Sequence, residues 1–243
     1  MAKRAPVKMS TEEVMAYLEE HGSETAKSTL IKHGAREPFF GTRIGDMKPL
    51  AKKIKRDHEL ALELYETGNS DAMYFAGLIA DESKITMEQL RRWVKQAYWY
   101  MLSESTVAWV AAESPHGFEL AREWMASADE MTACAGWSTF CSLLTIRDNH
   151  EFDVSELERL LDQIERTIHN ERNRVRYVMN QFVIAAGAAI PELTERCKAV
   201  GERIGKVDVD MGGTACKVPL IKPYIEKIEA RGAVGKKKKE ARC

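Results

Sequence analysis

Apolar residues recur along the chain at the three- and four-residue spacing of amphipathic helices. In the stretch 157–168, leucines and isoleucines keep this spacing while charged residues take the opposite side, so one helix face is buried. Ser10, Thr86 and Asp153 each begin such a stretch, and their side-chain oxygens can accept from unpaired first-turn amides. The pattern predicts about a dozen helices of ordinary length.

The helix starts return at similar points roughly every 40 residues, which is the spacing of a helical-repeat protein. Glycines just past apolar stretches, Gly34 and Gly68, mark helix ends. We therefore predict an all-α fold, a curved right-handed stack of antiparallel helix pairs, in a single domain over residues 10–231. The recurring starts are expected near Asp46, Thr86, Asp129 and Glu171.

Two stretches break the helical pattern with dense turn signals, 34–46 and 204–219. The first contains Phe39 and Phe40, which are expected to pack beneath a loop rather than to bind a ligand. In the second, valines alternate with charged residues before a glycine pair, which predicts a short strand pair or an extended loop ahead of a last helix.

The tail after Arg231 has no core residues to order it, so residues 232–243 are predicted to be flexible. Residues 1–9 are also expected to be flexible. The lysine run Lys236–Lys239 is interpreted as a solvated tail, with electrostatic contact to nucleic acid as the less favoured alternative.

Composition limits the classes of function. The chain has 243 residues, 44% of them hydrophobic, and a formal net charge of −1, so a polyanion can bind only at a local basic patch. Its five cysteines show no metal-ligand spacing and are expected to be reduced thiols. No apolar stretch reaches the length of a membrane span, and residues 1–10 lack the apolar core of a signal peptide. A cytoplasmic protein is expected.

Sequence motifs of common enzymes are missing. There is no phosphate-binding Walker loop, no G-x-S-x-G and no H-E-x-x-H, which argues against a nucleotide hydrolase, a serine hydrolase or a zinc enzyme. The six histidines lie mainly near predicted element ends, where capping is the simpler role. We expect no metal and no cofactor.

Basic residues gather in three patches at helical spacing. Within the third patch, Arg172 and Arg176 lie four residues apart and share a face. If equivalent helices line one concave face, the patches contact successive phosphates of DNA. The alternative is an ordinary solvated helix surface. The patches are Lys48, Lys52, Lys55 and Arg56; Arg91, Arg92 and Lys95; and Arg172, Arg174 and Arg176.

Aromatic residues cluster in 93–109. Core packing is the favoured explanation, although Trp93 and Trp99 point in different directions on a helix and at least one large ring should approach a cleft or solvent. The five rings are those of Trp93, Tyr98, Trp99, Tyr100 and Trp109.

Three segments, 39–50, 86–99 and 204–219, resemble the bacterial DNA alkylation repair family (AlkD-type) of HEAT-like helical-repeat proteins, and the similarity covers 10–231. The first includes Phe39-Phe40-Gly41 before a helix, and the last includes Ile204-Gly205-Lys206-Val207-Asp208. The resemblance implies DNA glycosylases that release cationic N3- or N7-alkylpurines.

The resemblance also places an active site at Trp99, with the catalytic Asp expected four residues later. This chain has Ser103 there, and serine cannot stabilise the positive charge that develops at C1′ during excision. Glu104 is adjacent, but one residue on an α-helix rotates a side chain by about 100°. A second aromatic is expected near Asn180 or Gln181, where this chain has none.

The leading hypothesis is therefore a monomeric DNA-binding member of this family, which grips duplex DNA, alkylated or branched, on a concave basic face. Whether it is an enzyme stays open, with Trp99, Ser103 and Glu104 as the candidate catalytic residues. The alternative is a catalytically inactive helical-repeat scaffold that binds a protein partner or branched DNA. The candidate DNA-binding residues are Arg43, Lys48, Lys52, Arg92, Lys95, Arg172, Arg174 and Arg176.

Overall fold

A computed structural model describes residues 6–242, and within that range the protein has thirteen α-helices and no strand. This confirms the predicted all-α class. The helices are α1 (Thr11–Glu20), α2 (Glu24–Lys32), α3 (Ile44–Ile54), α4 (His58–Glu66), α5 (Ser70–Ile79), α6 (Met87–Gln96), α7 (Ala108–Glu113), α8 (Gly117–Met125), α9 (Glu130–Ile146), α10 (Val154–Thr167), α11 (Asn173–Ala189), α12 (Thr194–Ile204) and α13 (Ile221–Ala230). A π-helical segment, η1 (Met101–Val107), precedes α7, and short 3-10 turns lie at η2 (Asn149–Glu151), η3 (Ile168–Asn170) and η4 (Pro191–Leu193).

Helix starts and ends follow the local signals in the sequence. Ser10 and Thr86 form complete capping boxes, and Asp129 and Asp153 accept first-turn amides. Gly34 and Gly68 follow α2 and α4 with φ of 96° and 69°, a conformation that glycine adopts without strain. The other two predicted starts are displaced: the N-caps are Arg43 for α3, three residues before Asp46, and Arg172 for α11, one residue after Glu171.

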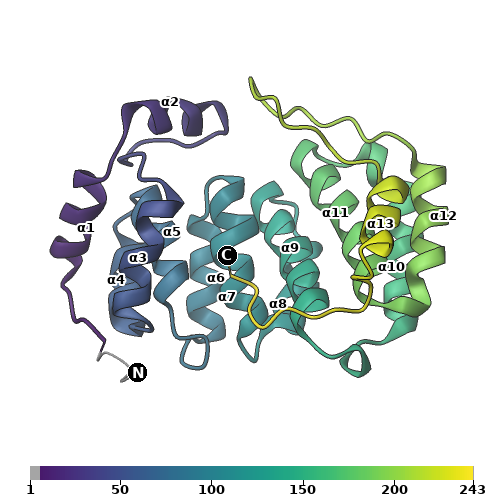
Figure 1. The fold of residues 1–243 in the computed structure, drawn as a ribbon, viewed down its shortest axis with the longest axis horizontal. Helices are drawn as coiled ribbons and strands as arrows, with labels where there is room; N and C mark the ends of the chain where they lie inside the picture. The colour runs from purple at the N-terminus through teal and green to yellow at the C-terminus, as the bar shows by residue number, and fades with distance from the viewer. Residues whose placement is uncertain (1–5, 243) are drawn as a thin grey trace.

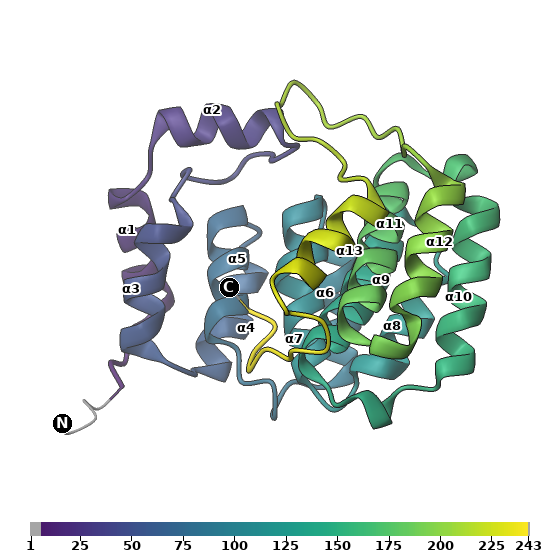
Figure 2. The ribbon, with the colours of Figure 1, turned by 45° about the vertical axis from the view of Figure 1, so that its right-hand side comes forward.

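The helices form two layers (Figures 1 and 2). The inner layer runs α5, η1 with α7, α9, α11 and α13, each in contact with the next, and α3 packs on α5 at its N-terminal end. The outer layer runs α4, α6, α8, α10 and α12. Ion pairs join successive outer helices: Arg92 with Glu66, Arg91 with Glu123, Arg122 with Glu156, and Arg203 with Glu165.

The core lies between these layers. Trp93 is fully buried and stacks on Tyr65 with ring centroids 4.1 Å apart, which accounts for one ring of the aromatic cluster. Phe39 is 3% exposed and belongs to the same core, with Phe40 packed against it, so the expectation that these rings pack beneath a loop is confirmed.

An arch spans one side of the inner layer. It is formed by α2 and by the segment 205–220, which is an extended loop rather than a strand pair. Figure 2 shows the end of α2 and this loop meeting. At the meeting point a Cβ on Gly212 would lie 2.6 Å from the Lys32 carbonyl oxygen.

The C-terminal residues correct the prediction of a flexible tail, because 232–242 lie along the inner layer. The Gly235 N–H donates to the Ala188 carbonyl at 2.8 Å, and the Lys238 N–H donates to the Thr145 carbonyl at 2.8 Å. We call residues 232–242 the C-terminal strap. The prediction for the N-terminal end lies partly outside the described residues, which start at residue 6; there the Val7 N–H donates to the Lys53 carbonyl at 3.0 Å.

Candidate nucleic-acid interface

The segment that resembles the glycosylase active site is π-helical. In η1 the backbone hydrogen bonds run from i to i+5, so the rotation of about 100° per residue that was used to separate Ser103 from Glu104 on an α-helix does not apply. Ser103 is fully buried, and its hydroxyl lies 3.4 Å from the Tyr100 carbonyl oxygen and 3.8 Å from the Met131 sulfur. The residue at the position of the expected catalytic Asp is therefore a core residue without access to DNA.

Glu104 forms a bidentate ion pair with Arg174 of α11. Nε and Nη2 of Arg174 donate to the two carboxylate oxygens at 2.5 and 2.7 Å, and the two side chains are only 11% and 12% exposed. Burial is the largest influence on both groups. It raises the pKa of Glu104, and although it acts to lower the pKa of Arg174, the hydrogen bonds and charge of Glu104 raise that pKa overall.

Two tyrosine rings enclose the arginine of this pair. The guanidinium carbon of Arg174 lies 4.0 Å from the ring centroid of Tyr100 and 4.0 Å from that of Tyr177. Two aromatic faces beside a carboxylate are suited to a flat cation. Here the slot is filled by a side chain of the protein itself.

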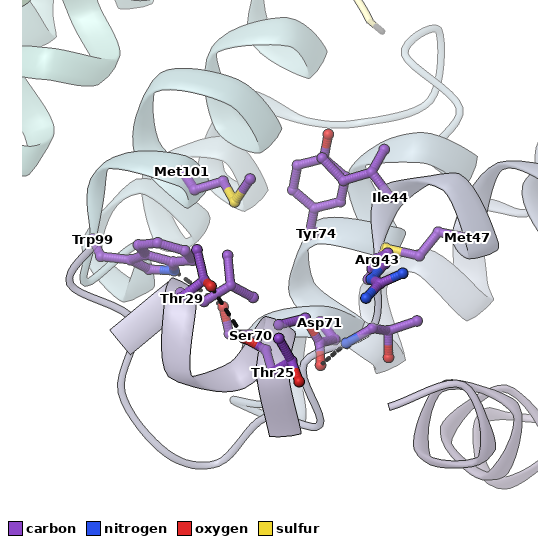
Figure 3. A pocket seen from close by; sticks show the side chains of 13 residues that line it. Thr25, Thr29, Arg43, Ile44, Met47, Ser70, Asp71, Tyr74, Trp99 and Met101 are labelled. Atoms are coloured by element: carbon purple, nitrogen blue, oxygen red, sulfur yellow. Dashed lines mark hydrogen bonds between the residues drawn. The ribbon is translucent and has the colours of Figure 1, made fainter. Parts of the chain in front are cut away.

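Trp99 is 4% exposed, and its indole N–H donates to the Ser70 hydroxyl at 3.0 Å. A cavity of about 370 Å³ lies on one side of the ring, under α2 (Figure 3). Figure 3 shows Trp99 and Met101 on one side of this cavity and Arg43 with Met47 on the other. Trp99 thus borders a cavity, as the aromatic cluster led us to expect of at least one large ring.

The wall of this cavity is fixed by Asp71 at the start of α5. Its carboxylate accepts the backbone N–H groups of residues 40–42 at 2.7 to 3.3 Å. Burial raises the pKa of Asp71 despite these three hydrogen bonds. Asp71 therefore holds the loop before α3, including exposed Arg43, against the inner layer.

A second cavity, of about 320 Å³, lies on the other side of Trp99 beneath the tip of the 205–220 loop. Its lining includes Tyr100, Arg174 and Met211. The Tyr100 hydroxyl lies 2.7 Å from His33 Nδ1 at the end of α2, so the arch is tied to η1 through this contact.

The three arginines at the start of α11 have separate partners. Arg172 donates to the carbonyls of Ser127 and Ala128 at 3.0 and 2.6 Å and so holds the loop before α9. Arg176 donates to the Asn173 side chain at 3.3 Å. Of the predicted patch, only Arg174 reaches the centre of the inner layer, and it is neutralised there.

The predicted patches on α3 and α6 lie in different layers. Lys48 and Lys52 are exposed on α3 and line a groove of about 440 Å³ between that helix and the C-terminal strap. Arg92 and Lys95 are exposed on α6, an outer helix, and Arg92 pairs with Glu66 at 3.0 Å. The patches on α3 and α11 lie with the inner layer, whereas the patch on α6 lies in the outer layer. The expectation that equivalent helices carry all three patches onto one face is therefore wrong.

A family model described as DNA alkylation repair enzyme matches residues 14–197. The chain belongs to the DNA alkylation repair family. Two proteins of uncharacterised function are similar over 205 residues, covering 82% of this chain and 88% of each relative: Lin0241 of Listeria innocua, 33% identical, and Lmo0209 of Listeria monocytogenes, 34% identical.

A solved structure is 40% identical, with a TM-score of 0.89, and the match covers 97% of this chain and 100% of that one. It is described as a member of a new family of proteins related to the HEAT-like repeat DNA glycosylases with affinity for branched DNA structures. The predicted resemblance and the HEAT-like repeat fold are confirmed.

Near the position where the resemblance to the DNA alkylation repair family led us to expect a second aromatic, Asn180 or Gln181, the nearest ring on α11 is that of Tyr177, one turn earlier. Asn180 is 1% exposed and donates to the Pro219 carbonyl at 3.0 Å, whereas Tyr177 stacks on Arg174. The three-residue spacing of Arg174 and Tyr177 was the signal for this contact, since such residues are neighbours on a helix.

Within residues 6–242 no group of three or more His, Cys, Asp or Glu side chains is arranged to hold a metal ion. In the same range no helix is both long and apolar enough to span a bilayer.

Proposed function

We propose that this protein binds DNA, duplex or branched, along its inner layer and does not excise alkylated bases. DNA binding is supported by membership of the DNA alkylation repair family and by the 40% identical solved relative with affinity for branched DNA. The absence of excision rests on one observation, the ion pair between Glu104 and Arg174.

Excision of an alkylpurine builds positive charge on the deoxyribose, which a nearby carboxylate stabilises. The carboxylate closest in sequence to the expected position is Glu104, and its charge is already used by Arg174. Arg174 also fills the space between Tyr100 and Tyr177 in which a cationic base would stack. Both the charge and the stacking surface that excision needs are therefore occupied.

Binding requires exposed cations instead, because phosphate contacts supply most of the affinity of a protein for DNA irrespective of sequence. On the inner layer, Lys48 and Lys52 of α3 fit this requirement, and Arg43 lies exposed at the mouth of the Trp99 cavity. We assign these three residues, rather than Arg92 and Lys95 of the outer layer, to the DNA backbone.

The test measures binding and base release on the same preparation. Fluorescence anisotropy with a labelled duplex and a four-way junction should show binding that weakens steeply between about 50 and 200 mM salt. Chromatography of N-methylated DNA after incubation should show no methylpurine release above the protein-free rate. No binding to either DNA at the lowest salt refutes the proposal and favours a protein-binding scaffold. Enzymatic release refutes the second half of the proposal.

A further inference from the structure

The C-terminal strap crosses the ends of successive inner helices. Its first contact is near the end of α11, where the Gly235 N–H donates to the Ala188 carbonyl at 2.8 Å. It then passes the Thr145 carbonyl near the end of α9, which accepts the Lys238 N–H. The Arg242 guanidinium then reaches the carbonyl of Ala80, just after α5, at 2.8 Å. Figures 1 and 2 show the strap on the side of the inner helices. It therefore follows one rim of the inner layer.

That rim is electronegative without the strap. The last carbonyls of each helix have no partner within the helix and carry the negative end of its dipole. Two carboxylates add to this, because Arg242 Nη2 lies 2.6 Å from Glu82 and Arg242 Nε lies 2.8 Å from Glu113. Arg242, whose side chain is only 3% exposed, anchors the strap and balances these two acids together with Arg56, whose Nε lies 3.1 Å from Glu82.

The lysines of the strap divide into two sets. Lys237 turns inward: its ammonium group donates to the Leu144 carbonyl at 2.7 Å and lies 5.5 Å from the ring centroid of Phe152. Lys236, Lys238 and Lys239 are exposed, and none of the three forms an ion pair with any residue of the range 6–242. One set attaches the strap and the other presents charge to solvent.

The strap also changes the charge balance of the chain. Residues 236–242 contain four lysines, Arg242 and a single acid, Glu240, so removing them would take the formal net charge from −1 to −5. The end of the strap lines the same groove as Lys48 and Lys52 of α3. The strap residues in that groove are Glu240 and the ion-paired Arg242, so the strap borders α3 there while its exposed lysines lie further along the rim.

We propose that the C-terminal strap is a DNA-binding element, in which exposed Lys236, Lys238 and Lys239 form a second phosphate-contacting wall facing the same ligand as Lys48 and Lys52. This deepens the proposed function and rests on it. The strap is attached at both ends before DNA arrives, so its lysines contact phosphate without the ordering cost that a disordered tail incurs.

The test compares two variants that lose the same charge. K238Q/K239Q removes two exposed strap cations, and R159Q/R166Q removes two exposed cations from α10 of the outer layer. Neither substitution touches the core, so both proteins should unfold at the wild-type temperature. Binding of a labelled duplex and of a four-way junction is measured across salt concentrations.

The strap variant should bind at least about tenfold more weakly at 0.1 M salt, and its slope of log affinity against log salt should fall by about 1.8, or about 0.9 per lost contact. The control should match the wild type. Equal behaviour of the two variants while the wild type binds DNA overturns the strap assignment alone. A wild type that binds neither DNA overturns the proposed function as well.

Discussion

Replacing Glu104 with glutamine should destabilise the protein by about 3–5 kcal/mol, because it leaves the buried Arg174 charged without a counter-charge. The two side chains are 11% and 12% exposed and share two charge-assisted hydrogen bonds of 2.5 and 2.7 Å. In a protein of 243 residues, each kcal/mol corresponds to about 2–4 °C in Tm. The Tm of E104Q should therefore fall by about 6–20 °C.

The loss should be specific to breaking the pair and should not follow from removing charge as such. In E104L/R174M both charges are replaced by apolar groups of similar volume, and the methionine can lie between Tyr100 and Tyr177 as the arginine stem does. Such replacements of whole buried pairs are often neutral or stabilising. The double variant should thus regain most of the stability that E104Q loses.

The assay is urea unfolding followed by circular dichroism, with thermal unfolding as a second measure. The matched control is E66Q, which breaks the exposed pair of Glu66 with Arg92 and should cost at most about 1 kcal/mol. If E104Q unfolds with the midpoint of E66Q, or if the double variant loses as much stability as E104Q, the pair does not hold the centre of the inner layer as argued.

Three further predictions concern the surface and the arch. K48Q/K52Q should weaken DNA binding and lower its salt dependence by about 1.8, whereas R92Q/K95Q on the outer layer should leave both unchanged in the same anisotropy assay; the reverse ranking would place DNA on the outer layer. Gly212→Val should detach the loop tip from Lys32 and speed tryptic cleavage in 205–220, whereas Gly213→Val, with open space at its Cβ, should not. The pKa of Asp71 in the folded protein lies above its ordinary 3.8, so protonation of this carboxyl contributes stability that is present below pH 3.8 and is lost as the pH rises through the raised pKa. In D71N this pH-dependent part of the unfolding free energy should disappear from urea unfolding measured across that pH range. A pH profile equal to that of the wild type contradicts the prediction.

Local signals explain why much of the fold is predictable. Capping at Ser10, Thr86 and Asp153 depends on hydrogen bonds within three residues, so the sequence shows it directly. The assignment of helices to the inner or outer layer cannot be read from such local hydrogen bonds. Starts at Thr86 and Asp129 look alike locally, although α6 is outer and α9 is inner, and only their partners in three dimensions distinguish them.

The parts of the site that were missed depend on contacts far apart in the sequence. Glu104 and Arg174 are separated by 70 positions, and Lys237 reaches a carbonyl 93 positions away. The π-helical segment Met101–Val107 also changes which side chains share a helix face, and its residue types do not predict a π-helix. The lysine run therefore resembled a solvated tail, since composition alone does not show that Gly235 and Arg242 donate hydrogen bonds to carbonyls at the ends of inner helices.

The distribution of charge bears on how such a protein would recognise DNA. The central cation of the inner layer, Arg174, is neutralised by Glu104 and lies between two rings. The exposed cations that we assign to DNA lie on α3 and on the strap at the rim. Contacts of this kind reach phosphates and carry no sequence information, so specificity has to come from the path of the backbone. Two separated cationic walls fit a ligand whose strands diverge better than a straight duplex, which they cannot both follow over many phosphates. On the proposed function, we therefore expect tighter binding to a four-way junction than to a duplex of equal length, and this preference should shrink in K238Q/K239Q, because that variant removes cations from one of the two walls.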